Sequence, residues 1–383
     1  MNATDILLHL MSCALNGTTP DGDVLSLIDD DMNKQLLRLA RLHSVSALAA
    51  QALEGTPACS EAWMQRKNNA LRRAVMFSAE RSALYAFLDE NHIWHMGLKG
   101  ILIQAFYPAF GLRESADNDI LFDPAYQEAV RDWFVARGYQ VKAYQQGAHD
   151  SYTKAPIYNF EMHTTLFSHF KDNARGTYYA NVKTRLVPSG IGSELRFTDD
   201  DAYVYFVAHA YKHHDSAGTG LRTLADFYVY QRAMGSRLDW AYIARECAKL
   251  GIDAFESGSR MLAQKIFTPS SQPFSADLTV EEEKLLCQFA GSGTYGTLQN
   301  KVKKNLRKMD PGAARPSLLT KLRYLIRRAM PDDEFMKEWC YMYFKPGYRH
   351  PILRIPARFI RLFKEILLKS SLLIREIKST MKQ

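Results

Sequence analysis

The sequence predicts an α+β protein in which a small mixed sheet lies between helical regions. Apolar residues recur at spacings of three and four through about the first ninety residues and again from Asp199 to about Phe289, as on the buried face of a helix. Between these parts, short apolar runs at residues 93–98 and 120–122 are separated by Gly and Pro, which is typical of short strands and turns. A further helical pattern follows Gln299 in a strongly basic segment.

The individual elements follow in order. Residues 93–98 form a strand, a turn at Lys99-Gly100 leads into a short helix over 101–107, and residues 120–122 form a second strand. A helix is expected over 124–137, because Pro124 suits a first helical turn and Gly138 suits a stop. Residues 139–144 and 158–167 have strand character. We therefore predict four regions: helical residues 1–90, the sheet at 91–198, a helical domain at 199–298 and a basic helical tail at 299–383.

Composition sets the broad class. The chain has 383 residues, of which 47% are hydrophobic and 23% charged, which excludes a largely disordered protein. No run approaches the roughly 18 apolar residues that a membrane-spanning helix needs, and the first residues lack the basic start of a secretory signal. We therefore expect a cytoplasmic protein. The cysteines are odd in number and form no CxxC pair, so we expect free thiols at Cys13, Cys59, Cys247, Cys287 and Cys340.

Charge is distributed unevenly along the chain. From Gln299 onward there are 21 Lys and Arg against 7 Asp and Glu, an excess of 14, whereas the preceding part has 28 against 34. The basic balance therefore belongs to the tail and implies a local anionic partner.

The candidate chemistry centres on carboxylates. Asp117 and Asp119 are two residues apart, so in an extended segment both side chains project from one face. Their repulsion favours a divalent cation, Mg²⁺ or Mn²⁺, and Glu161 can supply a third carboxylate with His163 beside it. Such a trio is the device used for in-line attack at a phosphate. An Asp-x-Asp tripeptide also occurs by chance in loops, so it does not decide the function alone.

Basic residues upstream fit a phosphate ligand. Lys99 and Gly100 lie where a strand becomes a helix, so free backbone N–H groups there could hold phosphate oxygens beside the Lys99 charge. If the ligand is a nucleoside triphosphate, Arg113 could add a bidentate contact to its phosphate groups. The alternative is that Lys99 and Arg113 only balance acidic groups at the surface.

These segments resemble a known family. They match, in order, the "LKG…YP…R…DxD" signature of the uncharacterised nucleotidyltransferase family, a branch of the DNA polymerase beta-like nucleotidyltransferase superfamily. The residues that carry this resemblance are Gly97-Leu98-Lys99-Gly100, Tyr107-Pro108, Leu112-Arg113 and Asp117-Asn118-Asp119. Downstream, Glu161-Met162-His163 resembles the family's E-x-H strand, and the segment from His209 through His213 and Arg222 to Asp226 resembles its H…H…GxGLRxLxD helices.

The resemblance implies a polymerase-beta-like core and transfer of a nucleoside monophosphate from an NTP to an acceptor, with pyrophosphate released. It implies Asp117, Asp119 and Glu161 as metal ligands, with Glu161 also a candidate base. It further implies Lys99, Gly100 and Arg113 around the triphosphate, and His163, His209, His213, Arg222 and Asp226 lining the cleft. Relatives are linked to envelope polysaccharide production, so the resemblance makes a sugar or a glycolipid a candidate acceptor. The sequence itself does not identify the acceptor, and a protein is a further candidate.

Three departures from the family pattern bear on activity. Lys99-Gly100 replaces the Gly-Ser that is usual in the wider superfamily and lies further than usual from Asp117. Asn118 stands between the acids where the family prefers an apolar residue, and Ala116 stands where a glycine is common. An unpaired buried amide at Asn118 would cost on the order of 1–3 kcal/mol. The second hypothesis is therefore a non-catalytic nucleotide-binding or scaffold protein that docks at a membrane through its tail.

A histidine cluster allows another interpretation. His209 and His213 are four residues apart and could bind a metal from one helix face. A phosphohydrolase site built from His209, His214, Asp215 and Asp226 is conceivable. Alternatively, these histidines bind no metal and only support the Gly218-Thr219-Gly220 loop that follows them.

The tail contains a basic amphipathic helix over residues 355–382. Its apolar face could pack on the protein's own core or a subunit, or lie on an anionic membrane surface at the inner face of the membrane. Scattered Lys and Arg support only sequence-independent nucleic-acid binding, so no sequence-specific nucleic acid is expected.

Overall fold

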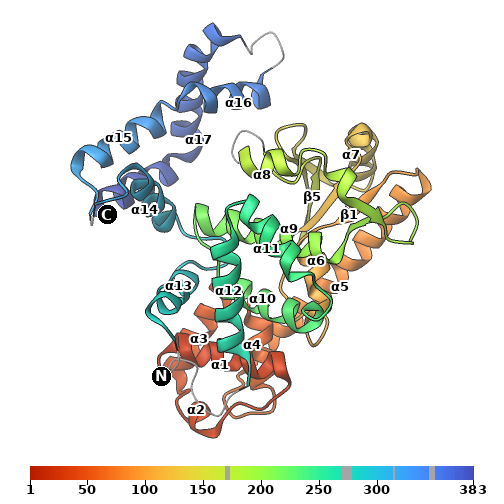
Figure 1. Ribbon diagram of the computed structural model, residues 1–383, viewed down its shortest axis with the longest axis vertical. Coiled ribbons are helices and arrows are strands. Elements are labelled where there is room, and N and C mark those ends of the chain that lie inside the picture. Colours follow the sequence, from red (N-terminus) through yellow and green to blue (C-terminus); the bar gives the residue numbers. More distant parts are fainter. Residues whose placement is uncertain (169–172, 270–277, 314, 345–349) are drawn as a thin grey trace.

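The computed structural model describes residues 1–168, 173–269, 278–313, 315–344 and 350–383 (Figure 1). It is an α+β protein with a small mixed sheet flanked by helices, which confirms the predicted fold class. The division into four regions stays a prediction.

The sheet has five strands in the order β1-β2-β5-β4-β3. The central pair, β2 and β5, is parallel, and every other neighbouring pair is antiparallel. The strands are β1 His95–Gly97, β2 Asn118–Phe122, β3 Gln140–Ala143, β4 His149–Lys154 and β5 Tyr158–His163. The sequence had not indicated β4, because its residues HDSYTK carry no apolar alternation. It had also extended the last strand to Phe167, beyond its end at His163.

The register of the central pair determines which side chains share a face. Asp119 lies opposite Glu161, and Leu121 lies opposite His163. Because successive side chains alternate between the two faces of a sheet, the intervening positions Ile120 and Met162 point the other way. They join a buried apolar cluster against helices α5 and α7. One face of the sheet is therefore core, and the other carries the acidic residues.

Helices cover the core face and connect the strands. The core face packs on Leu84 and Leu88 of α5 and on Val130 and Phe134 of α7. The elements are α5 Glu61–Glu90, α6 Gly100–Ile103, α7 Gln127–Ala136 and the 3₁₀ turns Gln104–Phe106 and Pro124–Tyr126. The predicted helix over 124–137 thus begins as a 3₁₀ turn, whose first free amide, that of Ala125, donates to the Asp123 side chain at 3.1 Å.

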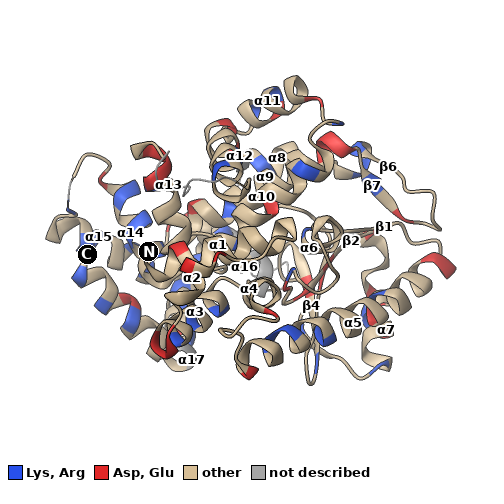
Figure 2. Ribbon diagram, turned by 90° about the horizontal axis from the view of Figure 1, so that it is seen from below, with Lys and Arg blue, Asp and Glu red and all other residues tan. Residues whose placement is uncertain are grey.

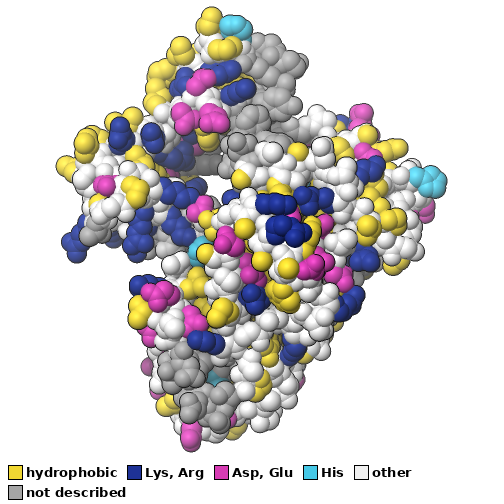
Figure 3. All heavy atoms as spheres, in the orientation of Figure 1, with side chains coloured by type: hydrophobic (Ala, Val, Ile, Leu, Met, Phe, Trp, Pro, Cys, Tyr) yellow, Lys and Arg dark blue, Asp and Glu magenta, His cyan; other side chains and the backbone are white. Residues whose placement is uncertain are grey.

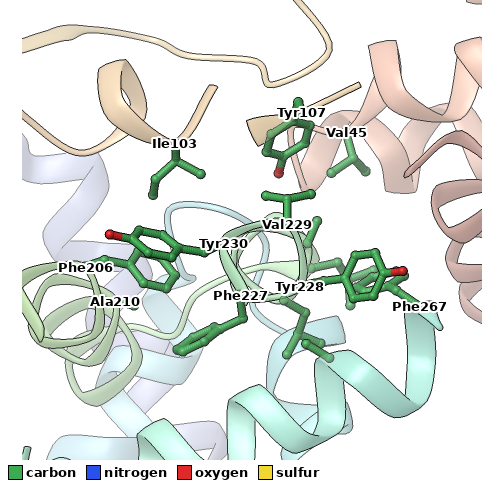
Figure 4. Close-up of a cluster of buried hydrophobic side chains, with 14 of the residues drawn as sticks. Val45, Ile103, Tyr107, Phe206, Ala210, Phe227, Tyr228, Val229, Tyr230 and Phe267 are labelled. Carbon is green, nitrogen blue, oxygen red and sulfur yellow. The ribbon is translucent and has the colours of Figure 1, made fainter. Parts of the chain in front are cut away.

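One hydrophobic core joins the N-terminal helices to those that follow the sheet. Its members include Leu7 of α1, Ala47 of α4, Phe227 of α10 and Phe267 of α12. Figure 4 shows how the side chains of α10 reach Phe206 and Ile103 on one side and Phe267 on the other. The helices are α1 Ala3–Asn16, α2 Gly22–Ser26, α3 Asp30–Leu42, α4 Ser46–Leu53, α8 Asn173–Tyr178, α9 Asp199–Ser216, α10 Leu221–Met234, α11 Trp240–Lys249, α12 Asp253–Phe267 and α13 Val280–Ala290. A 3₁₀ turn at Val182–Arg185 precedes a two-stranded hairpin, β6 Leu186–Pro188 and β7 Leu195–Phe197.

The basic tail is helical, as predicted. Lys304 donates to the carbonyl of His214, and Lys308 forms an ion pair with Asp215 at 2.7 Å, so the tail contacts the end of α9. Its elements are α14 Leu298–Met309, α15 Leu318–Ala329, α16 Asp333–Tyr343, the 3₁₀ turn Pro351–Leu353 and α17 Arg354–Lys382. Within the described residues, none of the helices combines the length and the apolar character needed to cross a bilayer.

The five cysteines are all unpaired thiols, as the sequence indicated.

Candidate active site

Three carboxylates converge on the face of the sheet opposite the apolar core. Asp117 precedes β2, Asp119 lies within it, and Glu161 lies beside Asp119 on β5. Oxygens of the three side chains all lie within 4.8 Å of one another. This set consists of hard oxygen donors, so it fits Mg²⁺ or Mn²⁺.

Asp119 has two side-chain partners on one oxygen, the ammonium of Lys99 and the imidazole of His163. Its Oδ1 lies 2.6 Å from Lys99 Nζ and 3.0 Å from His163 Nε2. Burial alone would raise the pKa of this carboxyl, but the Lys99 charge and the His163 hydrogen bond hold it well below its ordinary value. Asp119 is therefore ionised at any physiological pH.

The other two carboxyls differ from Asp119 and from each other. Burial, followed by the negative charge of Asp119, raises the pKa of Asp117 to about 6. The imidazole of His163 lowers the pKa of Glu161. Because ionised carboxylates that lie close together repel one another, Asp117 is the one of the three that takes up a proton most readily.

Lys99 is held in an unusual backbone conformation. Its φ and ψ are 52° and −114°, a region that glycine favours at the second position of a tight turn. The turn closes with the Ile101 amide donating to the Leu98 carbonyl at 3.1 Å. A non-glycine residue held there costs on the order of 1–3 kcal/mol, and such strain is concentrated at functional sites. The turn directs the Lys99 ammonium to Asp119.

The same turn changes one expectation about phosphate binding. The amides of Leu102 and Ile103 donate to the Lys99 carbonyl, and α6 is only one turn long. The set of free backbone amides at this turn is therefore smaller than the sequence indicated. The contact of Lys99 and Gly100 with a nucleotide stays a prediction.

Arg113 is engaged inside the protein. Its guanidinium makes a bidentate ion pair with Asp226 of α10, with both N–O distances at 2.8 Å, and Tyr107 donates to the same carboxylate at 2.8 Å. Both Arg113 and Asp226 are buried. Arg113 also lies against Gly100, where a Cβ would approach its Nη1 to 2.5 Å. This arrangement favours a positioning role for Arg113, and its predicted contact with the triphosphate is untested.

A second group of ligand-type side chains shares Glu161. His149 of β4 pairs with His163 across the sheet, and the Nε2 atoms of both lie 3.7 Å from Glu161 Oε2. The sequence had not indicated His149, because the polar strand that carries it has no periodic pattern. Two imidazoles and a carboxylate suit a softer ion than Mg²⁺, such as Zn²⁺ or Mn²⁺.

The histidines of α9 lie close to the carboxylates. His209 and His213 share a hydrogen bond between their Nε2 atoms at 3.1 Å. Burial, followed by the Lys99 charge, holds the pKa of His209 well below its ordinary value, and burial lowers that of His213 to about 4. Both are therefore neutral near pH 7.

The phosphohydrolase alternative finds no support in these positions. His214 lies between Phe255 and Phe289, Asp215 binds Lys308, and Asp226 binds Arg113. In the part of the chain that the structure describes, these residues belong to no group of three potential metal ligands.

Asn118 lies on the opposite face from the acids and is buried. Its side-chain oxygen accepts from Arg81 Nη1 of α5 at 3.0 Å, whereas its Nδ2 has no hydrogen-bond partner. The polar side chain at this position, where the family prefers an apolar residue, therefore has a hydrogen-bond partner for its oxygen but none for its nitrogen.

A cavity of about 620 Å³ connects these groups. All predicted site residues except His163 line it, together with apolar side chains from α6, α9 and α10. Its volume lies in the range of small-molecule sites. Arg222 lines this cavity while donating to the Glu114 carbonyl. Lining residues that the sequence had not indicated include Ser115, Tyr205 and Tyr295.

The sequence model of the uncharacterised nucleotidyltransferase family matches residues 30–268, which is more than half of the chain. The chain belongs to this family. The matched span holds all the predicted site residues and ends just after α12, so the basic tail lies outside it. A search of curated proteins and a search of solved structures found no match. Family membership and the group of three acids together support nucleotidyl transfer in general terms.

Proposed function

We propose that this member of the uncharacterised nucleotidyltransferase family is an active, metal-dependent enzyme. It transfers a nucleoside monophosphate from an NTP to a hydroxyl or phosphate of an acceptor, with a sugar, a glycolipid or a protein as the expected acceptor classes. The observation that supports it most is the convergence of Asp117, Asp119 and Glu161 at the wall of one cavity.

In the reaction, an acceptor oxygen forms a bond to the α-phosphorus as the bond between that phosphorus and the pyrophosphate oxygen breaks. Pyrophosphate leaves, and the proton of an acceptor hydroxyl passes to a base of the site. A divalent ion held by the three acids supplies charge neutralisation and orientation of the reacting oxygens.

The chain's own residues divide the remaining work. Asp119, which is ionised in the free protein, is suited to hold cations, whether the Lys99 ammonium or a metal ion. Lys99, which pairs with Asp119 at 2.6 Å, would be available to the phosphates if a metal ion supplied the counter-charge of that carboxylate instead. Glu161 has a lowered pKa, which favours a ligand role over a base role.

Arg113 and Asp226 would hold the wall that faces the nucleotide. Their bidentate pair fixes the segment before β2 to α10, and both residues line the cavity. Placement of this kind contributes to catalysis because reacting groups must be held in a near-attack arrangement.

The test compares the wild type with Asp117→Asn/Asp119→Asn in the presence of Mg²⁺ or Mn²⁺, each of the four NTPs and a cell extract. Pyrophosphate release is measured, and mass spectrometry identifies the modified acceptor. We expect the variant to lose at least 100-fold in rate. A matched control, Asp31→Asn/Asp132→Asn, removes two exposed carboxylates and should keep the wild-type rate.

Nucleotide binding by the wild type with no pyrophosphate from any NTP would contradict the proposal. That outcome would favour a non-catalytic nucleotide-binding or scaffold protein. Equal pyrophosphate release by the wild type and the Asp117/Asp119 variant would also contradict it, since the chemistry would then not depend on these acids.

A further inference from the structure

The long C-terminal helix α17 presents its polar side to the protein. Arg361 and Glu376 are 3% and 4% exposed. Glu376 accepts from Tyr324 of α15 at 2.6 Å and pairs with Arg328 at 3.3 Å, and Glu365 pairs with Arg328 at 2.9 Å. The guanidinium of Arg361 donates to the carbonyls of Arg328 and Ala329. Helices α15 and α17 therefore pack through ion pairs and hydrogen bonds.

The apolar side of α17 faces outward. Phe363 and Leu367 are 62% and 63% exposed, and the same class of exposed apolar residues continues to the end of the helix. At 100° per residue, eight of the ten exposed large apolar residues described on α17 lie within one arc of about 120°, whereas Ile360 and Leu372 lie outside it. The arc comprises Ile355, Phe359, Phe363, Ile366, Leu367, Ile374, Ile377 and Met381. A helix that only packed on its own protein would bury this side, so the arrangement indicates a partner outside the chain.

The charges beside the arc have one sign. Lys364, Arg375, Lys378 and Lys382 are exposed, whereas the acidic residues of α17, Glu365 and Glu376, are paired with Arg328. Figure 2 shows Lys and Arg on α14, α15 and α17 at the end of the molecule that holds the C-terminus. Figure 3 shows hydrophobic side chains along the outer edge of the α15 and α17 region, next to Lys and Arg.

We propose that α17 docks on the surface of an anionic phospholipid bilayer. An exposed apolar arc bordered by Lys and Arg matches the boundary between anionic headgroups and acyl chains, where such a helix lies in the plane of the membrane. The helix is about 43 Å long at 1.5 Å per residue, which gives an extended contact. A second copy of the chain fits less well, because the tail carries an excess of 14 positive charges that would repel its copy.

This proposal goes beyond the nucleotidyl transfer and does not depend on it. The test is sedimentation of the full chain with vesicles of phosphatidylcholine alone or of phosphatidylcholine with 30% phosphatidylglycerol. We expect at least tenfold tighter binding to the anionic vesicles, weakening as salt is raised.

Two variants separate the contributions. Phe359→Ser/Phe363→Ser/Ile366→Ser should lower binding to anionic vesicles at least tenfold. Lys364→Gln/Lys378→Gln/Lys382→Gln should remove most of the preference for anionic lipid. The matched control Val75→Ser/Val135→Ser/Ile191→Ser changes three exposed apolar residues outside the tail and should bind like the wild type. Circular dichroism checks that each variant keeps the wild-type helix content.

Equal recovery with both vesicle types, or unchanged binding by the apolar variant, would overturn the proposal. A dimer in light scattering that the apolar variant abolishes, without vesicle binding by the wild type, would assign the arc to a second copy instead. Pyrophosphate release in lipid-free solution reports on the active site separately, because the tail residues lie outside it.

Discussion

At the residue scale, one oxygen of Asp119 serves both the ammonium of Lys99 and the imidazole of His163. The sequence predicted the three acids, because residues two apart on a strand share a face, but it could not predict which cation neutralises them. The partner is set by the turn at Lys99, and the positive φ of Lys99 could not be predicted from the residues Lys-Gly alone. The partner depends also on the pairing of β4 with β5, which brings His149 to His163.

Lys99 should compete with metal ions for Asp119. Removing the ammonium in Lys99→Met leaves a buried carboxylate without its main partner, so we expect Mn²⁺ to bind about tenfold tighter in the absence of nucleotide, while the KM for NTP rises. Titration calorimetry or electron paramagnetic resonance measures Mn²⁺ binding. The control Lys34→Met alters an exposed ion pair on α3 and should leave both quantities unchanged. Weaker Mn²⁺ binding by Lys99→Met would show that Lys99 helps to assemble the site instead.

Asp226 should matter for stability as well as for the cavity wall. In Asp226→Asn the buried Arg113 guanidinium loses its counter-charge, and breaking a buried pair in this way costs roughly 3–5 kcal/mol. Urea unfolding followed by circular dichroism gives the free energy of unfolding. The exposed pair of Lys34 and Asp31 provides the comparison, since Asp31→Asn should cost no more than about 1 kcal/mol. Similar losses in the two variants would mean that the Arg113 pair is not a buried support.

At the element scale, three separate segments meet at the start of α10. The Leu221 amide donates to His43 Nδ1 at 3.1 Å, and the Thr294 amide donates to the Leu42 carbonyl at 3.0 Å. The end of α3, the start of α10 and the loop after α13 are thereby joined beside the cavity. The sequence placed these helices by their apolar spacing, but these contacts span more than 170 residues and leave no local pattern.

Gly220 should tolerate no side chain at this junction. A Cβ there would lie 2.7 Å from His43 Nδ1 and from the Thr294 backbone nitrogen, and 2.8 Å from the Gly293 carbonyl carbon. Because two of these atoms belong to the backbone, we expect Gly220→Ala to lower the free energy of unfolding by about 1–3 kcal/mol. Gly22→Ala is the control, since nothing lies within 4 Å of its Cβ position. Equal melting temperatures for Gly220→Ala and the wild type would contradict the tight junction.

At the scale of the whole molecule, the uneven charge of the chain was readable from the sequence, whereas the orientation of α17 was not. The residues 355–382 show a basic amphipathic helix, and that pattern is the same whichever face is turned inward. The choice follows from partners on α15, where Tyr324 and Arg328 attract Glu376 and Glu365. Pairings between distant segments of this kind decide what a helix buries.

Stability should fall in mild acid because buried histidines stay neutral in the folded state. Burial lowers the pKa of His43 to about 4, and the same cause lowers those of His213 and His214 to about 4. In the unfolded chain they titrate near 6.5, so the unfolded state binds more protons between these values. Their stabilising contribution is complete above pH 6.5 and is lost as the pH falls toward 4.

His43 offers the sharpest measurement of this effect. It is fully buried, and its contribution over this range is on the order of 3 kcal/mol. Urea unfolding of the wild type and of His43→Gln at pH 7, 6, 5 and 4.5 gives the difference in slope. We expect the variant, whose amide oxygen can still accept from the Leu221 amide, to lose stability less steeply. Parallel curves would contradict the assignment to His43.

The direct opposition of Asp119 and Glu161 in a parallel strand pair makes the spacing of the acids a property of the backbone. Inserting a single residue into β5 before Glu161 would turn this carboxylate and His163 toward the apolar core and bring Phe160 or Met162 to the cavity. Extra residues in the turn between β4 and β5 would leave the alternation intact. Insertions in the turn before Tyr158 should therefore leave the group of three acids intact, whereas a single-residue insertion between Tyr158 and Glu161 should disrupt it.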